Sequence, residues 1–366
     1  MKPDTASEAP PPRRLARLSV DLSAIRANWR TFARRAAPGE AAAVVKADAY
    51  GCGARRVALA LAEEGVRTFF VATLGEGVAA RQTLGDAHDI YVLNGPEAAT
   101  AHLFGPARLF PVLNDLDQIA LWNVAGAPTA AALHIDTGMN RLGLAVADVA
   151  AAKAALAHAD IPLVMSHLAC SSTPEHPLNA HQATLFAEAA AHFPGARKSL
   201  SATGGVFLGR PYLFDLVRPG IGLYGDNSLD AGGRQLAVAA TLEAPIVQVR
   251  AVGAGESVGY GASFVAPAPL IAATIALGYA DGYLRAASGR GYGVLAGVRC
   301  PVLGRVSMDL ITLDVTAAGG AARAGAWVEM LGAAAPLRDL AAAAGTAPYE
   351  VLTALAGVGR VYRSRS

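Results

Sequence analysis

Hydrophobic residues recur along the first part of the chain in short uninterrupted runs, separated by longer stretches rich in alanine and leucine. The runs fall near residues 41–45, 69–73, 90–93, 109–113, 130–135, 162–166, 198–201 and 219–224. Short apolar runs bounded by turn residues are typical of buried strands, and the stretches between them have helical periodicity. The pattern therefore predicts eight strands that alternate with helices.

Alternation of strands and helices indicates a parallel sheet, because parallel neighbours need a crossover connection. Eight such units in about 200 residues fit a closed (β/α)8 TIM-like barrel, and an open doubly wound sheet is the alternative. In a barrel, the side chains that bind or react with a ligand are expected where the strands end, because all the carboxyl ends meet at one mouth.

The alternation of strands and helices stops at a polar stretch near residues 226–234, and such a stretch is typical of a linker. Five β-type runs then follow one another across glycine and proline turns, at residues 242–252, 270–277, 294–302, 310–315 and 326–331. Short helices are expected near residues 337–344 and 349–356. The pattern predicts an α/β chain with a barrel over residues 15–233 and a mostly antiparallel β domain over residues 234–366.

The N-terminal segment differs from the rest of the barrel. Residues 1–14 contain prolines and charges but no apolar stretch of signal-peptide type, so we expect a disordered extension on a cytoplasmic protein. Residues 18–22 predict a short strand. Ser23 is expected to cap a helix whose apolar face includes Ile25 and Phe32.

Composition narrows the classes of partner. The 366 residues have a formal net charge of +2, and the basic residues are scattered, which argues against a nucleic-acid-binding or membrane-binding surface. The three cysteines are far apart and form no CxxC pair, which argues against a disulfide framework and against a zinc cluster. A small molecule is the expected ligand.

Lys46 stands at the end of the first apolar run, just before Tyr50 and a glycine-rich turn. The chain contains only four lysines, at positions 2, 46, 153 and 198. Lysine can lose its proton when it is desolvated and arginine effectively cannot, so a lone lysine at the end of a buried strand favours a chemical use of its amine. A surface lysine that closes the strand is the alternative.

Polar side chains also follow the later strands. Arg141 comes after the fifth run, His167 after the sixth and Thr203 after the seventh, and Arg218 precedes the eighth. Each residue taken alone has an ordinary explanation as a core histidine, a salt-bridge partner or a turn residue. Taken together with the amine of Lys46, they indicate a pocket for pyridoxal 5'-phosphate, in which the lysine forms the Schiff base and a glycine-rich turn holds the phosphate.

Seven sequence blocks occur in order along the chain, from about residue 15 to residue 360. They are VVKADAYGCG, HIDTGMNRLG, SHLAC, RPGIGLYG, VGYGASF, LGYADGYLR and GRVSMD. In sequence and order they resemble alanine racemase, a barrel-type family of pyridoxal phosphate enzymes that makes the peptidoglycan precursor D-alanine. The resemblance implies interconversion of L-alanine and D-alanine, and it implies that the strand at 18–22 joins the β domain.

The resemblance also implies a role for each matched residue. Racemisation needs one base on each face of the Cα atom. Lys46 would be the base on the D-alanine face, and Tyr260, supplied by the partner subunit, the base on the L-alanine face. The cofactor would be held by Lys46, Tyr50, His167, Thr203, Arg218, Gly220 and Ile221.

The substrate contacts follow from the same resemblance. Arg141 would approach the cofactor's phenolic oxygen, the backbone N–H of Met308 from the partner subunit would meet the substrate carboxylate, and Tyr279 would narrow the entrance. A site that takes residues from two chains implies an obligate homodimer with two shared sites.

Three positions depart from the family pattern. His134 stands where many relatives have a carbamylated lysine that braces the arginine. Ala202 replaces the asparagine before Thr203, and residues 355–360 lack the tyrosine that usually reaches the phosphate. These departures make a racemase of another or broader amino-acid range, such as serine, the alternative enzyme. A non-catalytic protein that binds and delivers the cofactor is the alternative from another class.

Overall fold

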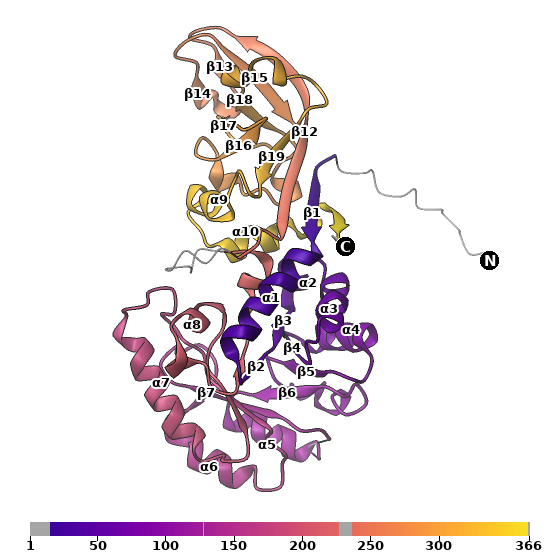
Figure 1. The fold of residues 1–366 in the computed structure, drawn as a ribbon, viewed down its shortest axis with the longest axis vertical. Coiled ribbons are helices and arrows are strands. Elements are labelled where there is room, and N and C mark those ends of the chain that lie inside the picture. The colour runs from indigo at the N-terminus through magenta and orange to yellow at the C-terminus, as the bar shows by residue number, and fades with distance from the viewer. Residues whose placement is uncertain (1–14, 127, 227–235, 365–366) are drawn as a thin grey trace, which may run out of the picture. The chain divides into compact units, whose positions relative to one another are not determined.

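The computed structural model describes residues 15–126, 128–226 and 236–364, which form two compact units (Figure 1). Among these residues, the barrel unit comprises 20–240, 346–356 and 362–364, and the β unit comprises 15–19, 241–345 and 357–361. The expected extension at residues 1–14 lies outside the described residues. So does the expected linker, apart from Asp226.

Parallel strands form the centre of the barrel unit, in the order β10-β9-β7-β6-β5-β4-β3. The strands are β2 (Glu40–Ala41), β3 (Ala43–Val44), β4 (Thr68–Val71), β5 (Asp89–Val92), β6 (Phe110–Leu113), β7 (Ala132–Asp136), β8 (Leu144–Ala145), β9 (Leu163–Met165), β10 (Arg197–Ser199) and β11 (Leu216–Val217). Their side chains fill the core, where Phe70 stacks on Tyr91 with ring centroids 5.2 Å apart.

The strands close into a cycle. β11 pairs in parallel with β2, and the N–H of Ala42, between β2 and β3, donates to Val217 O at 2.9 Å. On its other side, β11 is joined to β10 by hydrogen bonds from Asp215 N to Lys198 O and from Arg218 N to Ser201 O. The predicted TIM-like barrel is confirmed, and the open doubly wound sheet is excluded.

Helices cover the outside of these strands (Figure 1). They are α1 (Leu22–Ala36), α3 (Ala54–Glu63), α4 (Leu74–Leu84), α5 (Leu116–Val124), α6 (Val149–Ala155), α7 (Pro177–Ala190) and α8 (Thr203–Phe207). The short element α2 (Lys46–Tyr50) follows β3 and has left-handed backbone angles. Helix α10 (Pro348–Ala354) also belongs to the barrel unit, although the sequence places it in the C-terminal domain.

Two predictions for the barrel unit were wrong in detail. The run at 219–224 is not a strand: β11 ends at Val217, and Ile221–Tyr224 form the 3-10 turn η4. Helix α1 is capped by Asp21, not by Ser23. The Asp21 carboxylate accepts the N–H groups of Ser23 and Ala24, which a single carboxylate oxygen can do for two adjacent amides of a first turn.

An antiparallel sheet forms the β unit. Its order is β15-β18-β17-β16-β19-β12-β1-β20, and because β15 also pairs with β12 the sheet closes on itself. Its strands are β1 (Arg17–Asp21), β12 (Ala240–Val252), β15 (Leu270–Ile275), β16 (Tyr292–Leu295), β17 (Val298–Leu303), β18 (Ile311–Asp314), β19 (Trp327–Leu331) and β20 (Gly359–Arg363). A separate two-stranded sheet is formed by β13 (Ser257–Val258) and β14 (Phe264–Val265). Helix α9 (Leu337–Ala344) follows β19.

The predicted run at 294–302 is a hairpin of two strands. Ala296 and Gly297 have φ values of 49° and 81°, so the chain reverses between Leu295 and Val298, which face each other across β16 and β17. The sequence did not predict this turn, because the run is apolar and Ala296 is not a typical turn residue. The closing strand β20 was not predicted. The opening strand β1 lies between β12 and β20.

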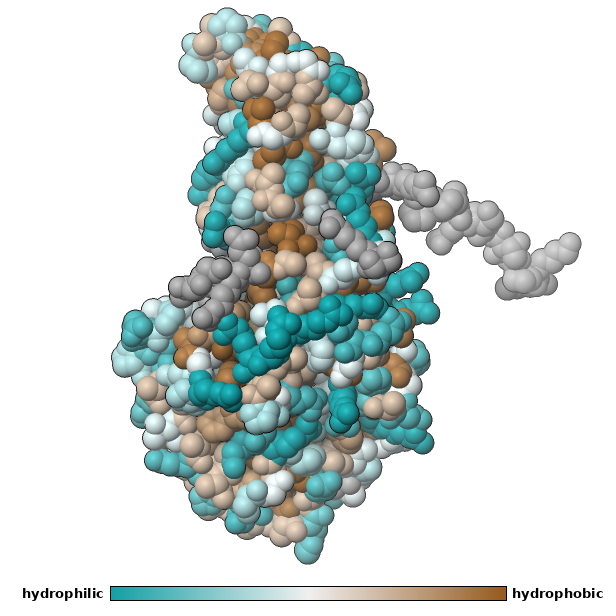
Figure 2. Space-filling model, viewed as in Figure 1, coloured by the Kyte–Doolittle hydropathy of each residue, from teal (hydrophilic) through white to brown (hydrophobic). Residues whose placement is uncertain are grey.

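The surface of the barrel unit is charged where α1 runs. Figure 2 shows hydrophilic side chains gathered over this helix, and the contacts explain them: Arg26 pairs with Glu63, and Arg30 pairs with Glu64. In the part of the chain that the structure describes, no helix is long and apolar enough to cross a bilayer.

Candidate active site

Lys46 lies where β3 ends, at the first position of α2. Burial lowers the pKa of its amine, the Arg141 guanidinium lowers it further, and the Glu76 carboxylate acts in the opposite direction. A lysine with a lowered pKa is more easily unprotonated, which a nucleophilic or basic amine requires. These surroundings differ from those of a surface lysine that closes a strand.

A cradle of backbone amides lies near this strand. Thr203 Oγ1 accepts the N–H groups of Gly220 and Gly222 at 3.0 and 3.2 Å. The N–H of Ile221, between them, has no acceptor among the described residues. The Tyr50 hydroxyl lies so close to Gly220 that a Cβ atom there would be 2.3 Å from it. The structure therefore brings together four of the residues predicted to hold the cofactor, which are Tyr50, Thr203, Gly220 and Ile221.

Arg218 is buried beneath the mouth and holds four of its five N–H groups in hydrogen bonds. Nη1 donates to the backbone oxygen and the hydroxyl of Ser199, and Nη2 donates to the backbone oxygens of Ser166 and Leu200. A guanidinium has five donors. The Nε–H has no acceptor among the described residues, so it is left for a ligand. Burial lowers the pKa of this guanidinium to about 9.

His134 is held in one tautomer by Asn114. The ring Nδ1 lies 2.9 Å from Asn114 Oδ1. The Asn114 amide is oriented by its nitrogen, which donates to the backbone oxygens of Leu93 and Val112 and to Gln118 Oε1. Its oxygen must therefore face the imidazole, and Nδ1 carries the proton. Nε2 is then left as an acceptor for a ligand or a neighbouring group.

Both imidazoles near the mouth are held neutral. Burial, together with the charges of Arg218 and Arg141, lowers the pKa of His134 to about 4, and Asp136 partly opposes them. Burial lowers the pKa of His167 to about 3, and Arg218 and Arg141 contribute again. A proton on either ring would add charge to a site that already holds cations.

The loop that carries Arg141 is shaped by Asp136. The Asp136 carboxylate accepts the N–H groups of Gly138 and Met139, each at 2.8 Å, which folds the segment back after β7. The Arg141 side chain is exposed, and it has no hydrogen-bond or ion-pair partner within the described residues. It is therefore free to bind an anionic or electron-rich ligand group.

Tyr349 is a neighbour of the cradle that sequence reasoning missed. It lies in α10, and its ring centroid is 6.2 Å from that of Tyr50, which in turn lies 4.9 Å from that of Tyr224. The Tyr224 hydroxyl donates to Val44 O, two residues before Lys46. Burial and Asp226 raise the pKa of Tyr349. The predicted helix at 349–356 was the available signal, but its docking on residue 50 was not visible in the sequence.

The β unit holds the other predicted residues at its surface. Tyr260 is 71% exposed in the 3-10 turn η5 (Tyr260–Ala262), between Gly259 and Gly261, which have φ values of 78° and 71°. The guanidinium of Arg305 lies beside Gly261, 3.4 Å from where a Cβ atom would stand. Arg305 is a second residue that sequence reasoning missed, although it lies in the matched block GRVSMD.

Tyr279 and Met308 lie together in the β unit. The N–H of Tyr279 donates to Ser307 O at 3.0 Å, and the N–H of Ala280 donates to Met308 O at 2.9 Å. The two side chains are 41% and 54% exposed, and the N–H of Met308 has no acceptor among the described residues. Predicted site residues thus gather in two groups, one in each unit.

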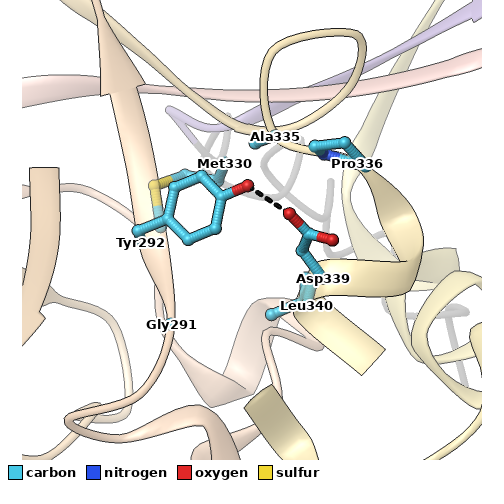
Figure 3. A pocket seen from close by; sticks show the side chains of 7 residues that line it. All are labelled: Gly291, Tyr292, Met330, Ala335, Pro336, Asp339 and Leu340. Carbon is cyan, nitrogen blue, oxygen red and sulfur yellow. Dashed lines mark hydrogen bonds between the residues drawn. The ribbon is translucent and has the colours of Figure 1, made fainter. Parts of the chain in front are cut away.

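A small pocket in the β unit is separate from both groups. It lies between β16, β19 and α9, where the Tyr292 hydroxyl donates to Asp339 Oδ2 at 2.6 Å (Figure 3). Burial and this hydrogen bond raise the pKa of Tyr292 to about 12. The two polar groups satisfy each other, and none of the predicted residues lines the pocket, so it is not the candidate active site.

Comparison with known protein families identifies the family of enzymes to which these two groups of residues belong. The family model for the alanine racemase N-terminal domain matches residues 20–228, and the model for the alanine racemase C-terminal domain matches residues 239–363. The chain belongs to the alanine racemase family. The resemblance seen in the seven sequence blocks is thereby confirmed.

Individual alanine racemases are similar to the chain over nearly all of its length. The alanine racemase of Rhodospirillum rubrum is 47% identical, covering 94% of each chain. A catabolic alanine racemase of Agrobacterium fabrum is 44% identical, covering 94% of this chain and 90% of its own. Alanine racemase from Bartonella henselae, solved with covalently bound pyridoxal phosphate, superposes with a TM-score of 0.91 at 36% identity, covering 95% of this chain and 99% of that one.

Proposed function

We propose that this chain is a pyridoxal phosphate-dependent racemase that interconverts L-alanine and D-alanine in the cytoplasm. The observation that carries the proposal is Lys46: an amine with a lowered pKa at the end of a barrel strand, beside an amide cradle, in a member of the alanine racemase family. The product D-alanine follows from reprotonation on the face opposite to that from which the proton left.

The residues present fit the cofactor. The Ile221 N–H, the Thr203 hydroxyl and the Tyr50 hydroxyl suit a phosphate group, which prefers backbone amides and hydroxyls. The remaining Nε–H of Arg218 suits an uncharged ring nitrogen, because a guanidinium donates a hydrogen bond without accepting a proton. These residues would hold pyridoxal phosphate, whose ring would supply an electron sink for the substrate.

The protein's own groups move the protons. The Lys46 amine, unprotonated more readily than an exposed lysine, takes or returns the Cα proton on one face. The Tyr260 phenol does so on the other face. His167 is held neutral, so it packs against the cofactor and supports hydrogen bonding without adding positive charge.

Binding of the substrate uses groups that lack internal partners. The Arg141 guanidinium would hold the cofactor's phenolic oxygen, and the N–H of Met308 would donate to the substrate carboxylate. Tyr279, beside Met308, narrows the entrance to a small side chain. Both Met308 and Tyr279 are exposed on the β unit.

Tyr260 and Met308 act in the partner subunit's site. Their exposure supports this assignment, because a catalytic phenol that is 71% exposed needs another surface to exclude water and to orient it. We therefore infer an obligate homodimer with two shared sites. A monomeric but fully active enzyme would contradict this arrangement.

Chiral analysis of the product tests the proposal. The purified protein is incubated with pyridoxal phosphate and L-alanine, and D-alanine is measured by chiral chromatography, with L-serine and larger L-amino acids as parallel substrates. We expect D-alanine, and a higher kcat/KM for alanine than for serine. Absence of D-alanine at any protein concentration would reject the activity, and a preference for serine would indicate the broader racemase instead.

A further inference from the structure

The residues that follow Lys46 have an unusual backbone. Four consecutive residues that are not glycine, Ala47, Asp48, Ala49 and Tyr50, have φ values between 52° and 55°, so they form a left-handed turn. This conformation costs about 1–2 kcal/mol per residue for L-amino acids. Such a run persists only where the surrounding structure holds it, and the groups that hold it also determine where Lys46 points.

Glu76 holds the beginning of the turn. Its Oε1 accepts the N–H of Ala47, which belongs to the peptide bond after Lys46, at 2.7 Å. Its Oε2 accepts the N–H groups of Ala72 at 2.7 Å and Thr73 at 3.3 Å. The carboxylate therefore joins the exit of β3 to the exit of β4.

A capping box alone does not explain this arrangement. Thr73 caps α4 and accepts the N–H of Glu76, and the reciprocal bond from Thr73 N–H needs only Oε2. The other oxygen is directed at the peptide that follows Lys46. The far end of the turn is held separately, because Asp48 Oδ1 accepts the N–H of Ala54 at 2.7 Å.

Glu76 is also the negative charge that raises the pKa of the Lys46 amine. The amine is otherwise influenced by burial and by Arg141, and its own charge lowers the pKa of His167. Arg141 and His167 are cationic or can become cationic, so Glu76 alone opposes the loss of the proton from the amine among the groups that act on it here.

We propose that Glu76 is a positioning residue for Lys46: its carboxylate fixes the peptide after the lysine at the start of the left-handed turn and so sets the direction of the amine. The inference rests on the proposed function, in which that amine binds the cofactor and moves a proton. It adds a residue outside the seven matched blocks to the machinery of the site.

The test compares Glu76→Gln with Thr73→Ala. Glu76→Gln keeps one oxygen but removes the charge, and it places an NH₂ group against one of the two sets of N–H donors. Thr73→Ala weakens the cap of α4 and leaves the contact with Ala47. Each apoprotein is mixed with pyridoxal phosphate, and covalent attachment to Lys46 is followed by absorbance over a range of pH.

We expect Glu76→Gln to change two features of the pH profile of cofactor attachment: its midpoint pH and its plateau rate at high pH. The midpoint moves to lower pH, because the opposing carboxylate is gone. On the plateau at high pH, where the amine is unprotonated in every variant, attachment becomes about tenfold slower because the amine is misdirected. Thr73→Ala lowers the melting temperature but keeps both the midpoint and the plateau rate of the wild type.

Two outcomes overturn the proposal: a wild-type plateau rate in Glu76→Gln, or an equal slowing in Thr73→Ala. If Glu76→Gln does not fold, Glu76→Asp replaces it, since the shorter side chain cannot span both strand exits and the same slowing is expected. A wild-type protein that attaches no cofactor would instead refute the proposed function, so the two failures are distinguishable.

Discussion

The two groups of candidate residues differ in how firmly the surrounding protein orients their side chains before a ligand binds. In the barrel unit, Arg218 uses four of its N–H groups on protein acceptors, and His134 is fixed in one tautomer by Asn114. In the β unit, Tyr260 and Met308 are 71% and 54% exposed. The first group is built into a core and the second lies on a surface.

Burial is the reason for this difference. A polar group in the core must be paired, so the pairing that satisfies it also orients it before any ligand arrives. An exposed phenol has water as its partner and keeps its rotational freedom. The β unit therefore supplies groups that become oriented only against another surface, and the nearby Leu310, 43% exposed, is an apolar residue that such a surface would cover.

Lys46→Ala should have the largest effect, because it removes the cofactor's covalent anchor and one base together. We expect racemase activity to fall by at least about 10⁴-fold. Borohydride reduction followed by peptide mass analysis should find no cofactor adduct. A cofactor adduct on Lys153 or Lys198 would show that a lysine other than Lys46 binds the cofactor.

Tyr260→Phe should remove the base that we propose for the L-alanine face. Proton removal from L-alanine should slow by about 10²–10⁴-fold, while cofactor attachment at Lys46 stays at the wild-type level. Initial rates from each enantiomer measure this effect, and Tyr212→Phe, outside both groups of candidate residues, is the matched control. Wild-type rates in both directions would leave the exposed phenol without a catalytic role.

Mixing the two inactive variants tests whether the exposed group acts on the partner's site. If Lys46→Ala and Tyr260→Phe subunits exchange at random, half of the dimers are mixed and each has one intact site, so about a quarter of wild-type activity should return. Activity is measured after co-refolding equal amounts of the variants. Both residues acting within one chain would restore none.

His134 should make acid destabilise the barrel unit. Its pKa is 6.5 when unfolded and about 4 when folded, so the unfolded state binds the extra proton and stability is lost as pH falls from 6.5 to 4. The loss attributable to this group is about 3 kcal/mol at most. His134→Asn should flatten the fall in melting temperature over this range, whereas His192→Asn, at an exposed position, should not.

Tyr349 should have the smallest effect, because it supports the cradle only through Tyr50. Tyr349→Ala should weaken the affinity of the apoprotein for pyridoxal phosphate by up to about tenfold, the worth of one aromatic contact. Tyr349→Phe keeps the ring and should bind as the wild type does. Fluorescence titration measures both, and equal weakening in the two variants would point to the hydroxyl instead.

Local pattern was enough for much of the fold. Apolar runs located seven barrel strands closely because buried parallel strands need continuous hydrophobic sequence. The prediction of the eighth strand was wrong. The run at 219–224 contains Pro219 and Gly220, and its amides donate toward Thr203 instead of a neighbouring strand. Whether such a run becomes a strand depends on which acceptors the fold brings near it.

The sequence by itself determined the barrel, the antiparallel domain and the family, because these depend on hydrophobic periodicity and on residues close together in the chain. Only the tertiary structure decided the roles of Glu76, Asn114 and Tyr349. Each acts on a residue at least 20 positions away, and the contact exists only after the strands and helices have packed. Periodicity records which face of an element is buried, and it does not record what lies against that face.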